Sequence, residues 1–298
     1  MRKQSRVAKI RSKAIDLLVL LIFLLPAFMS IMWIHSVFAS ADHREVFSSE
    51  QLSAFHDNRY PVDSGSVKPF DEPLITITFD DGWESTYSEG LPLLEKYGIA
   101  STHYILGDNF GNPEYLSLAQ AHALQDAGHE IAAHTMTHPD LTKLSHDKLD
   151  WELSESDRLL TKEFGNIQDF ATPLGASNDS VVAQTKFYYR SLRNTASDPA
   201  VLNGDDINTR DKFNPYNINA YTVRSTTKPE DIQRLIDYTI QTKGWLVLTY
   251  HDVGDSESSF WAVKPQDIDN QLRQVRDSRV RTATMGKVLD TLYPKVGK

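Results

Sequence analysis

From Leu74 onward, short apolar runs alternate with amphipathic segments, and this alternation constrains the fold more than any other feature of the sequence. Apolar runs at 74–79, 101–106 and 129–134 are each followed by a stretch with helical periodicity. An order of strand, helix, strand, helix is typical of a parallel sheet whose strands are joined by helical crossovers. The sequence therefore predicts an α/β domain.

The alternation continues toward the C-terminus. Further strand-like segments occur at 169–173, 188–196, 220–225 and 245–250, and helices are expected at 229–244, 265–279 and 285–294. About seven β-α units in about 225 residues are typical of a parallel sheet that curls into a (β/α) barrel. We expect a distorted barrel of seven to eight units, closed or incomplete. Its active face should lie at the C-terminal ends of the strands.

Residues 1–41 differ from the rest of the chain in composition. Six basic residues precede the segment 17–41, which contains no Asp, Glu, Lys or Arg. A run of this length can span a bilayer, and Ala39-Ser40-Ala41 also offers a small-residue cleavage site. We expect an uncleaved membrane anchor in preference to a cleaved signal peptide. Either one places the rest of the chain outside the cytoplasmic membrane, because the basic flank stays inside.

The remainder divides into a stalk at 42–70, which is interrupted by Pro, Gly and Ser, and a globular domain at 71–298. The whole chain has a formal net charge of −9, and residues 1–41 carry six positive charges and one negative charge, so the part beyond them carries −14. A surface this acidic argues against nucleic-acid binding, which depends on neutralising phosphates. No feature of the sequence predicts an oligomeric state.

Chemically useful side chains follow three of the expected strands. The first run continues into DDG at 80–82, the third ends at His134 with His138 four residues later, and His251 follows the run at 245–250. The chain has no cysteine, so a metal ion would have to be bound by His, Asp, Glu or water. Each motif alone is also typical of an ordinary turn. Together they place two imidazoles, a carboxylate pair and a further imidazole on one rim, which turn chemistry does not explain.

These segments resemble the motifs of a known family. TFDDG at 78–82, HTMTH at 134–138 and LTYH at 248–251 resemble the first, second and fifth signature motifs of the polysaccharide deacetylases, the NodB-homology carbohydrate esterases. The resemblance covers about residues 70–290. It implies a distorted (β/α) barrel that uses one divalent metal ion, commonly zinc, to remove acetyl groups from N-acetylated and sometimes O-acetylated polysaccharides.

The resemblance also implies roles for individual residues. Asp81, His134 and His138 would bind the metal ion. Asp80 would be the general base that takes a proton from the attacking water, and His251 would be the general acid that protonates the departing amine. An acetamide is a poor electrophile, so the metal ion is needed to polarise its carbonyl and to activate the water.

Other residues are expected on the substrate side of the site. The resemblance places four residues near the substrate or its oxyanion: Pro173, Leu174, Leu248 and Tyr250. The Leu174 amide would help to stabilise the oxyanion. Three aromatic residues flank the site in sequence and are candidates for sugar stacking: Trp83, Phe260 and Trp261. Aromatic residues beside strand ends also serve in packing, so both roles stay open for them.

Two motifs depart from the family pattern. The third motif reads FATPLG at 170–175, with Ala171 where many members have an arginine that orients the base. Arg190, Arg193 and Arg224 are candidates to replace it. An alanine here also resembles the extracellular poly-N-acetylglucosamine deacetylase branch. The fourth motif, which would give His251 an acidic partner, has no clear match; the nearby candidates are Asp198, Asp205 and Asp206.

The sequence thus predicts a membrane-anchored or secreted, metal-dependent N-deacetylase that acts on a cell-wall or matrix glycan. Two alternatives stay open. An O-deacetylase of the acetyl xylan esterase type would need the same site and an easier leaving group. A carbohydrate-binding protein that has lost catalysis would account for Ala171 and for the missing fourth motif.

Overall fold

The computed structural model describes residues 71–195, 207–255 and 259–292. The chain divides into two compact units, residues 1–51 and 52–298, and all described residues belong to the second. The anchor expected at 17–41, the stalk at 42–70 and the acidic candidates Asp198, Asp205 and Asp206 lie outside the described residues. Among the helices of the described ranges, none has both the length and the apolar character needed to cross a bilayer.

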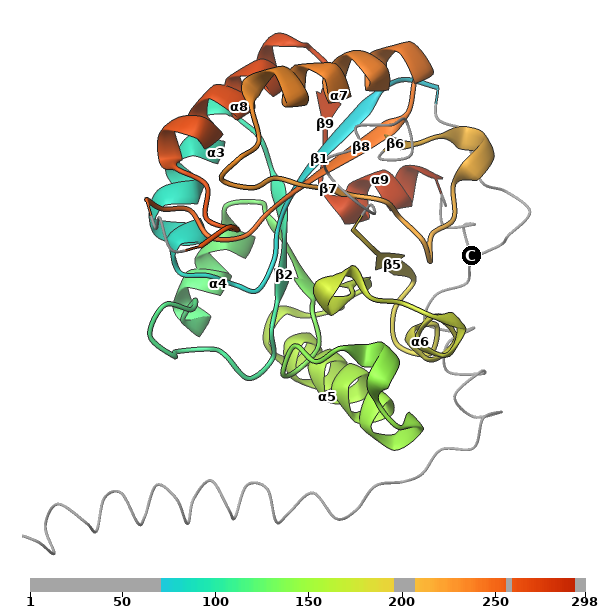
Figure 1. Cartoon of the computed structure of the whole chain (residues 1–298). Helices are drawn as coiled ribbons and strands as arrows, with labels where there is room; N and C mark the ends of the chain where they lie inside the picture. The colour runs from blue at the N-terminus through green and yellow to red at the C-terminus, as the bar shows by residue number, and fades with distance from the viewer. Residues whose placement is uncertain (1–70, 196–206, 256–258, 293–298) are drawn as a thin grey trace, which may run out of the picture. The chain divides into compact units, whose positions relative to one another are not determined.

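A curled, mostly parallel sheet forms the centre of the domain (Figure 1). Its strands follow the order β5-β4-β3-β2-β1-β8-β6, with β7 paired to β8 and β9 paired to β1. The strands are β1 (Leu74–Phe79), β2 (Ser101–Ile105), β3 (Glu130–Ala133), β4 (Asp169–Ala171), β5 (Ser191–Arg193), β6 (Ile207–Asn208), β7 (Tyr221–Thr222), β8 (Trp245–Tyr250) and β9 (Arg281–Thr282). Only β6 runs antiparallel to its partner among these pairs.

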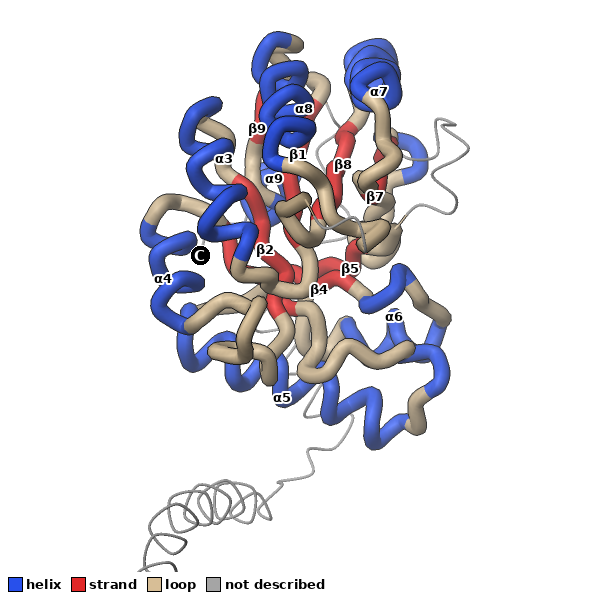
Figure 2. Tube along the Cα trace, turned by 60° about the vertical axis from the view of Figure 1, so that its left-hand side comes forward, coloured by secondary structure: helices blue, strands red, loops and turns tan. Residues whose placement is uncertain are grey.

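The sheet approaches closure without a continuous strand between β5 and β7. One isolated bridge joins Arg193 of β5 to Ile218, and Tyr221 of β7 then pairs with Leu248 of β8. β5 and β7 are shorter than the strands expected at 188–196 and 220–225. The predicted distorted and incomplete (β/α) barrel is therefore confirmed (Figure 2).

Helices fill the connections and cover the outside of the sheet, as the views in Figures 1 and 2 show. They are α3 (Leu91–Tyr97), α4 (Leu118–Asp126), α5 (His146–Phe164), α6 (Asp179–Thr185), α7 (Pro229–Thr242), α8 (Pro265–Asp277) and α9 (Met285–Leu292). Short helical turns occur at η1 (Thr86–Gly90), η2 (Leu141–Lys143), η3 (Pro173–Gly175) and η5 (Arg210–Lys212). Proline in the first turn of α3, α7 and α8 explains why those helices begin where they do.

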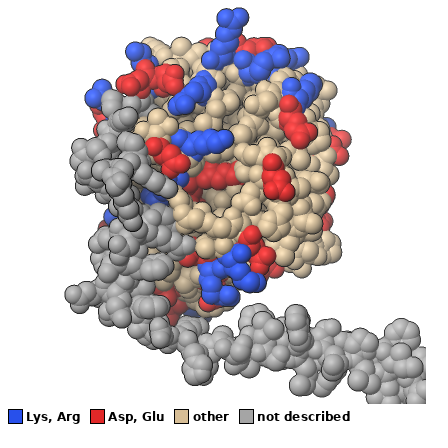
Figure 3. Space-filling view, turned by 180° about the vertical axis from the view of Figure 1, so that it is seen from behind, with Lys and Arg blue, Asp and Glu red and all other residues tan. Residues whose placement is uncertain are grey.

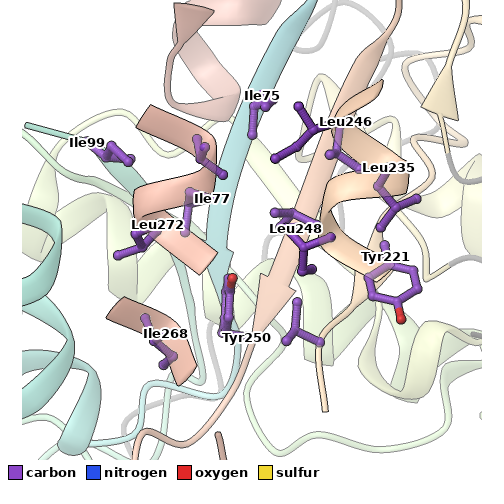
Figure 4. Close-up of a cluster of buried hydrophobic side chains, with 14 of the residues drawn as sticks. Ile75, Ile77, Ile99, Tyr221, Leu235, Leu246, Leu248, Tyr250, Ile268 and Leu272 are labelled. Carbon is purple, nitrogen blue, oxygen red and sulfur yellow. The ribbon is translucent and has the colours of Figure 1, made fainter. Parts of the chain in front are cut away.

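The alternation of side chains along the strands separates two apolar layers. Ile75 and Ile77 of β1 and Leu246 and Leu248 of β8 point outward and pack with residues of α7 and α8 (Figure 4). The alternate residues point into the barrel, where Thr78 of β1 donates a hydrogen bond to another inward threonine on β8. Because side chains alternate, the residue two positions beyond Thr78 also lies on the inner side, at the rim.

The opposite end of the barrel is closed by α9. Glu130, at the start of β3, accepts hydrogen bonds of 2.9 Å from the Thr102 hydroxyl and from the Gly286 amide at the beginning of α9. Beside it, Asp169 is paired with Arg190. Burial, followed by the charge of Asp169, raises the pKa of Glu130 to about 8. This end of the barrel is therefore a polar junction that fixes α9 to the sheet.

The outer surface in Figure 3 carries acidic and basic side chains interspersed with uncharged ones. The net negative charge of the chain beyond residue 41 is thus not gathered into a single patch on this face. Uncharged residues also cover wide areas between the charged groups on the same face.

Candidate active site

The C-terminal ends of four strands bring the predicted site residues to one rim of the barrel. Asp80 directly follows β1, His134 follows β3, Arg193 ends β5 and His251 follows β8. The Asp80 amide bonds to the last carbonyl of β8, at 2.9 Å, which fixes the two neighbouring strand ends together. The convergence expected from the β-α order is therefore present.

Asp81, His134 and His138 form a cluster with the geometry of a metal site. The Asp81 Oδ1 lies 3.4 Å from the Nε2 of His134 and 3.3 Å from the Nε2 of His138. All three ligand atoms lie within 4.8 Å of one another. A tetrahedral ion with bonds of about 2.0–2.2 Å separates its ligand atoms by about 3.3–3.6 Å. The donor set, two imidazole nitrogens and one carboxylate oxygen, fits a divalent ion such as zinc.

Neighbouring groups orient these ligands. The His134 Nδ1 lies 2.9 Å from the Ala171 carbonyl oxygen, to which its N–H donates, so its Nε2 is left to face Asp81. The Trp83 indole N–H donates to the other carboxylate oxygen of Asp81, at 3.1 Å. Trp83 also stacks on Tyr115 with ring centroids 4.8 Å apart. Trp83 thus holds a ligand carboxylate and packs on a neighbouring ring.

The segment 134–138, here called the metal loop, has an unusual backbone. Thr135 and His138 adopt left-handed conformations with φ of 73° and 60°, and Asp81 has a φ of 70°. Such conformations cost about 1 kcal/mol or more for residues other than glycine and persist only where surrounding contacts impose them. The His138 amide donates to the Thr135 hydroxyl at 3.1 Å, which supplies one of those contacts.

Glu152 of α5 provides the other contacts of the metal loop. One of its carboxylate oxygens accepts hydrogen bonds from the Met136 and Thr137 amides, at 2.9 and 3.0 Å. The other oxygen accepts from the Thr137 hydroxyl at 2.5 Å. Glu152 is only 5% exposed. The sequence reasoning missed this residue, because it lies on the polar-looking helix that follows the metal loop and matches no motif.

A buried ion pair holds the proposed base. One terminal nitrogen of Arg193, Nη2, lies 2.6 Å from each carboxylate oxygen of Asp80. Both side chains are buried, and the guanidinium carbon lies 4.9 Å from the centre of the Tyr104 ring. Ala171 of β4 is the register partner of Arg193 on β5. Many family members have an arginine at the position of Ala171. In this chain Arg193 provides the guanidinium instead, from the paired position on the adjacent strand.

The two other arginine candidates have different surroundings. Arg190 pairs with Asp169 at the opposite end of the barrel. Arg224 lies over the rings of Phe260 and Trp261. Arg193 is thus the candidate that contacts Asp80.

His251 lies beside Asp80 at the same rim. Its Nε2 is 3.9 Å from the Asp80 Oδ2, beyond hydrogen-bonding distance. Burial lowers the pKa of His251 despite the opposing charges of Asp80 and Asp81. Its Nδ1 is buried and has no hydrogen-bond partner within 71–195, 207–255 and 259–292. The acidic partner expected from the fourth motif is therefore not among these residues.

The electrostatics of the cluster favour an ionised Asp81 and a neutral His138. Burial opposes ionisation of Asp81, but the proximity of the His134, His251 and His138 imidazoles outweighs that effect, so its pKa falls below the usual range. Burial, followed by the proximity of His134, lowers the pKa of His138. A carboxylate with neutral imidazoles is the protonation state that binds a metal ion.

The four expected substrate-side residues have different environments. Pro173 is buried and begins η3, whereas Leu174 is 67% exposed beside it. Leu248 and Tyr250 are fully buried between the sheet and its helices (Figure 4). The Tyr250 hydroxyl donates to Gln271 of α8 at 2.9 Å. Leu248 and Tyr250 were expected near the substrate, but their side chains occupy outward positions of β8 and do not reach the inner side of the barrel.

Comparisons with known proteins show which family part of this chain is similar to. The family model described as polysaccharide deacetylase matches residues 67–189. The matched segment contains Asp80 and the three metal-site residues, whereas Arg193 and His251 lie beyond it.

Two relatives and one solved structure illustrate the similarity. The chain is 27% identical over 169 residues to YxkH of Bacillus subtilis (strain 168), a protein named after the polysaccharide deacetylases, and the match covers 53% of this chain and 60% of that one. It is 32% identical over 119 residues to a peptidoglycan-N-acetylglucosamine deacetylase of Bacillus cereus, covering 40% of this chain and 54% of that one. This chain therefore spans little more than half the length of these relatives.

The fold has a counterpart in the crystal structure of the Xyl-CE4 domain of a multidomain xylanase from the hindgut metagenome of Trinervitermes trinervoides. The TM-score is 0.51 with 18% sequence identity, and the alignment covers 74% of this chain and 91% of that domain. A likeness at this identity concerns the fold alone. The sequence match over residues 67–189 shows that this part of the chain is similar to the polysaccharide deacetylase family.

Proposed function

We propose that the protein is a metal-dependent hydrolase that removes acetyl groups from an N-acetylated polysaccharide. The observation that carries this proposal is the shared rim on which a complete ligand set, Asp81 with His134 and His138, lies beside the buried Asp80–Arg193 pair. Hydrolysis of an acetamide needs these two functions, a site for a Lewis acid and a positioned base, within reach of one substrate group.

The residues divide the reaction between them. A divalent ion at the triad, with zinc as the expected metal, would polarise the acetyl carbonyl and make a nearby water more acidic. Asp80 accepts the proton of that water as it attacks the carbonyl carbon, and Arg193 keeps the Asp80 carboxylate in place. His251 donates a proton to the nitrogen of the breaking C–N bond, so the products are acetate and a free amine on the sugar.

The lowered pKa of His251 has a consequence for its role as the general acid. Because burial favours the neutral imidazole, His251 must gain a proton within the catalytic cycle before it donates one. Asp80 lies nearest, with 3.9 Å between its Oδ2 and the His251 Nε2, and is the group from which that proton would come after the attack of water. The alternative of direct protonation from solvent requires a lower pH.

The alternative of a lapsed, purely binding protein loses part of its support. Ala171 favoured that alternative because it removes an arginine expected to orient the base. Arg193 occupies the paired position on β5 and lies 2.6 Å from both Asp80 oxygens, which compensates for Ala171. The residues that the proposed reaction needs therefore lie together, and a partner for the His251 Nδ1 is missing among the described residues.

The proposed substrate is an N-acetylglucosamine-containing glycan of the cell wall or extracellular matrix. The peptidoglycan-N-acetylglucosamine deacetylase relative supports this substrate class. The apolar segment 17–41 supports an extracytoplasmic location, with the protein held at the membrane by that segment or released from it.

The test is acetate release by the full-length chain, purified in detergent, from a pentamer of N-acetylglucosamine. We expect activity that is lost on chelation and restored by zinc. The variant Asp80→Asn should lose about 100-fold or more in kcat, the contribution typical of a positioned base, with its metal content unchanged. His138→Ala should lose both bound metal and activity, because one of the three ligands is gone.

Matched controls use exposed residues of the same type. Asp147→Asn and His146→Ala, at the solvent-exposed start of α5, should keep wild-type activity and metal content. Equal acetate release by wild type and Asp80→Asn would disprove the role of Asp80. Release from acetylated xylan without release from any N-acetylated glycan would replace the N-deacetylase proposal by the O-deacetylase alternative.

A further inference from the structure

Two exposed aromatic side chains stand on the β8 side of the metal site. Phe260 and Trp261 lie in the loop between β8 and α8 and are 46% and 43% exposed. Their rings are 5.2 Å apart and nearly perpendicular, with an interplanar angle of 71°. Large apolar side chains that stay exposed next to a site rimmed by polar groups are typical of ligand contact surfaces.

This aromatic pair is continuous with the candidate active site. The Trp261 ring lies 5.2 Å from the ring of His251, tilted by 36°. The loop is also fixed at its outer side, because the Ser225 amide donates to the Phe260 carbonyl at 3.2 Å. Phe260 and Trp261 therefore form a surface beside His251, the proposed acid, and a backbone hydrogen bond holds their loop in place.

Arg224 completes the surface. Its guanidinium carbon lies 4.8 Å from the centre of the Phe260 ring and 5.1 Å from that of Trp261. Its side chain makes no ion pair or hydrogen bond with the residues that the structure describes, and its Nε is buried without an acceptor. A guanidinium held on aromatic faces is weakly hydrated and presents its planar edge to a bidentate acceptor. This cation is thus available to a ligand.

The topology places the surface to one side of the metal site. The metal ligands follow β1 and β3, whereas Trp261 follows β8, on the other side of β1 from β2 and β3. The exposed Leu174 follows β4, on the opposite side. A glycan whose acetyl group reaches the metal site can therefore extend its next sugar unit over the Phe260–Trp261 pair, on the β8 side.

We propose that Arg224, Phe260 and Trp261 form a subsite for the sugar unit next to the one that is deacetylated, and that this unit carries a carboxylate. The inference rests on the proposed function. The apolar C–H face of a sugar ring packs on an aromatic ring, as other flat amphipathic groups do. A carboxylate on the same unit accepts paired hydrogen bonds from the Arg224 guanidinium, the strongest pairing that this side chain makes.

The test measures binding, so that it does not depend on acetate release. The full-length Asp80→Asn protein, loaded with zinc, is titrated by calorimetry with a tetramer of alternating N-acetylglucosamine and N-acetylmuramic acid. The same tetramer with its carboxylates amidated is the matched neutral ligand. Adding Arg224→Gln should weaken binding of the acidic tetramer about tenfold or more, as loss of a charged hydrogen bond does, and should weaken binding of the amidated tetramer much less.

Trp261→Ala, in the same background, should weaken binding of both tetramers about fivefold or more, because each ligand loses the same ring contact. Controls come from the exposed side of α7: Arg234→Gln and Tyr238→Ala should bind both ligands as the parent does. Equal weakening of the acidic and amidated tetramers by Arg224→Gln, or unchanged binding by Trp261→Ala, would overturn the subsite. Absence of acetate release by the wild-type chain, with this binding pattern intact, would instead refute the proposed reaction and leave the subsite in place.

Discussion

The Asp80–Arg193 ion pair leads to a prediction about an arginine variant. The outcome distinguishes this chain from a protein in which the arginine of the third motif is lost and not replaced. Arg193→Ala removes the guanidinium that lies 2.6 Å from Asp80 and leaves that carboxylate buried without this cation. Asp80 is 2% exposed and Arg193 is fully buried, so water cannot readily replace the guanidinium. The substitution should therefore affect both stability and the position of the base.

The size of the effect follows from the burial of both groups. Breaking a buried ion pair by removing one partner costs about 3–5 kcal/mol, because the remaining charge is left without compensation. We expect the free energy of unfolding of Arg193→Ala to be lower by about that amount, so this variant should unfold at a lower urea concentration. The rate should fall about 100-fold or more in kcat, with a smaller change in KM, because the base is misplaced while the metal site stays intact. Arg193→Lys should recover part of both losses, since an ammonium keeps the charge without the planar fork.

A sharper test moves the arginine from position 193 on β5 to position 171 on β4. Ala171 and Arg193 are register partners on adjacent parallel strands, about 4.8 Å apart, and both point into the barrel. In the double variant Ala171→Arg/Arg193→Ala, the new side chain can enter the space left by the old one and return a guanidinium to Asp80. We expect kcat to rise at least tenfold above that of Arg193→Ala, with metal content constant throughout. A structural defect alone would not be repaired by an arginine on the neighbouring strand.

The controls and the refuting outcome are direct. Arg234→Ala removes an exposed arginine on α7 and should leave stability and kcat as in the wild type. Acetate release and urea unfolding are measured on the same preparations, so that a folding loss is recognised. If Arg193→Ala keeps wild-type kcat, or if the transposed arginine gives no recovery although the double variant is folded, Arg193 does not position Asp80.

Three further predictions concern contacts around the barrel. Glu152→Gln should weaken zinc affinity about tenfold or more by competitive titration, because one acceptor of the metal-loop amides becomes an amide itself; unchanged affinity would refute its support of the loop. Trp83→Phe keeps a ring but loses the hydrogen bond to Asp81, and should weaken zinc affinity by a similar factor; tight binding by Trp83→Phe would show that the bond does not matter. Glu130 keeps its proton up to about pH 8 in the folded protein but ionises near pH 4.5 when unfolded, so its contribution is present below about pH 4.5 and declines as pH rises toward 8. The wild type should therefore lose stability relative to Glu130→Gln between pH 5 and 8 in urea unfolding, and equal pH profiles would contradict the buried, protonated state.

Much of the architecture was predictable because local sequence and tertiary structure agree. The apolar runs that became β1 and β8 keep the bounds expected for them, since their outward residues meet helices and their inward residues line the barrel. The metal-site residues follow strands whose ends converge in any barrel of this kind. Their proximity is therefore a consequence of strand order and needs no knowledge of side-chain packing.

Other parts of the site depend on pairing that one sequence does not reveal. Arg193 meets Asp80 because β5 lies beside β4 in a particular register, and a shift of one residue would turn Arg193 away. Glu152 reaches the metal loop because α5 packs across its backbone. Leu248 and Tyr250 are a different case. The alternation of side chains on β8 already indicates that His251 and these two residues face opposite sides, and this signal was available in the sequence.

The pairing of β1 with β8 has a consequence for when the protein can become active. Phe79 lies opposite Tyr250, so the strand that presents Asp80 is completed by one made about 170 residues later. Contacts so distant along the chain form late in folding. A chain that is still being synthesised therefore cannot bring Asp80 and His251 together until β8 has also been made. The order of synthesis itself keeps the nascent protein inactive until nearly the whole barrel is present.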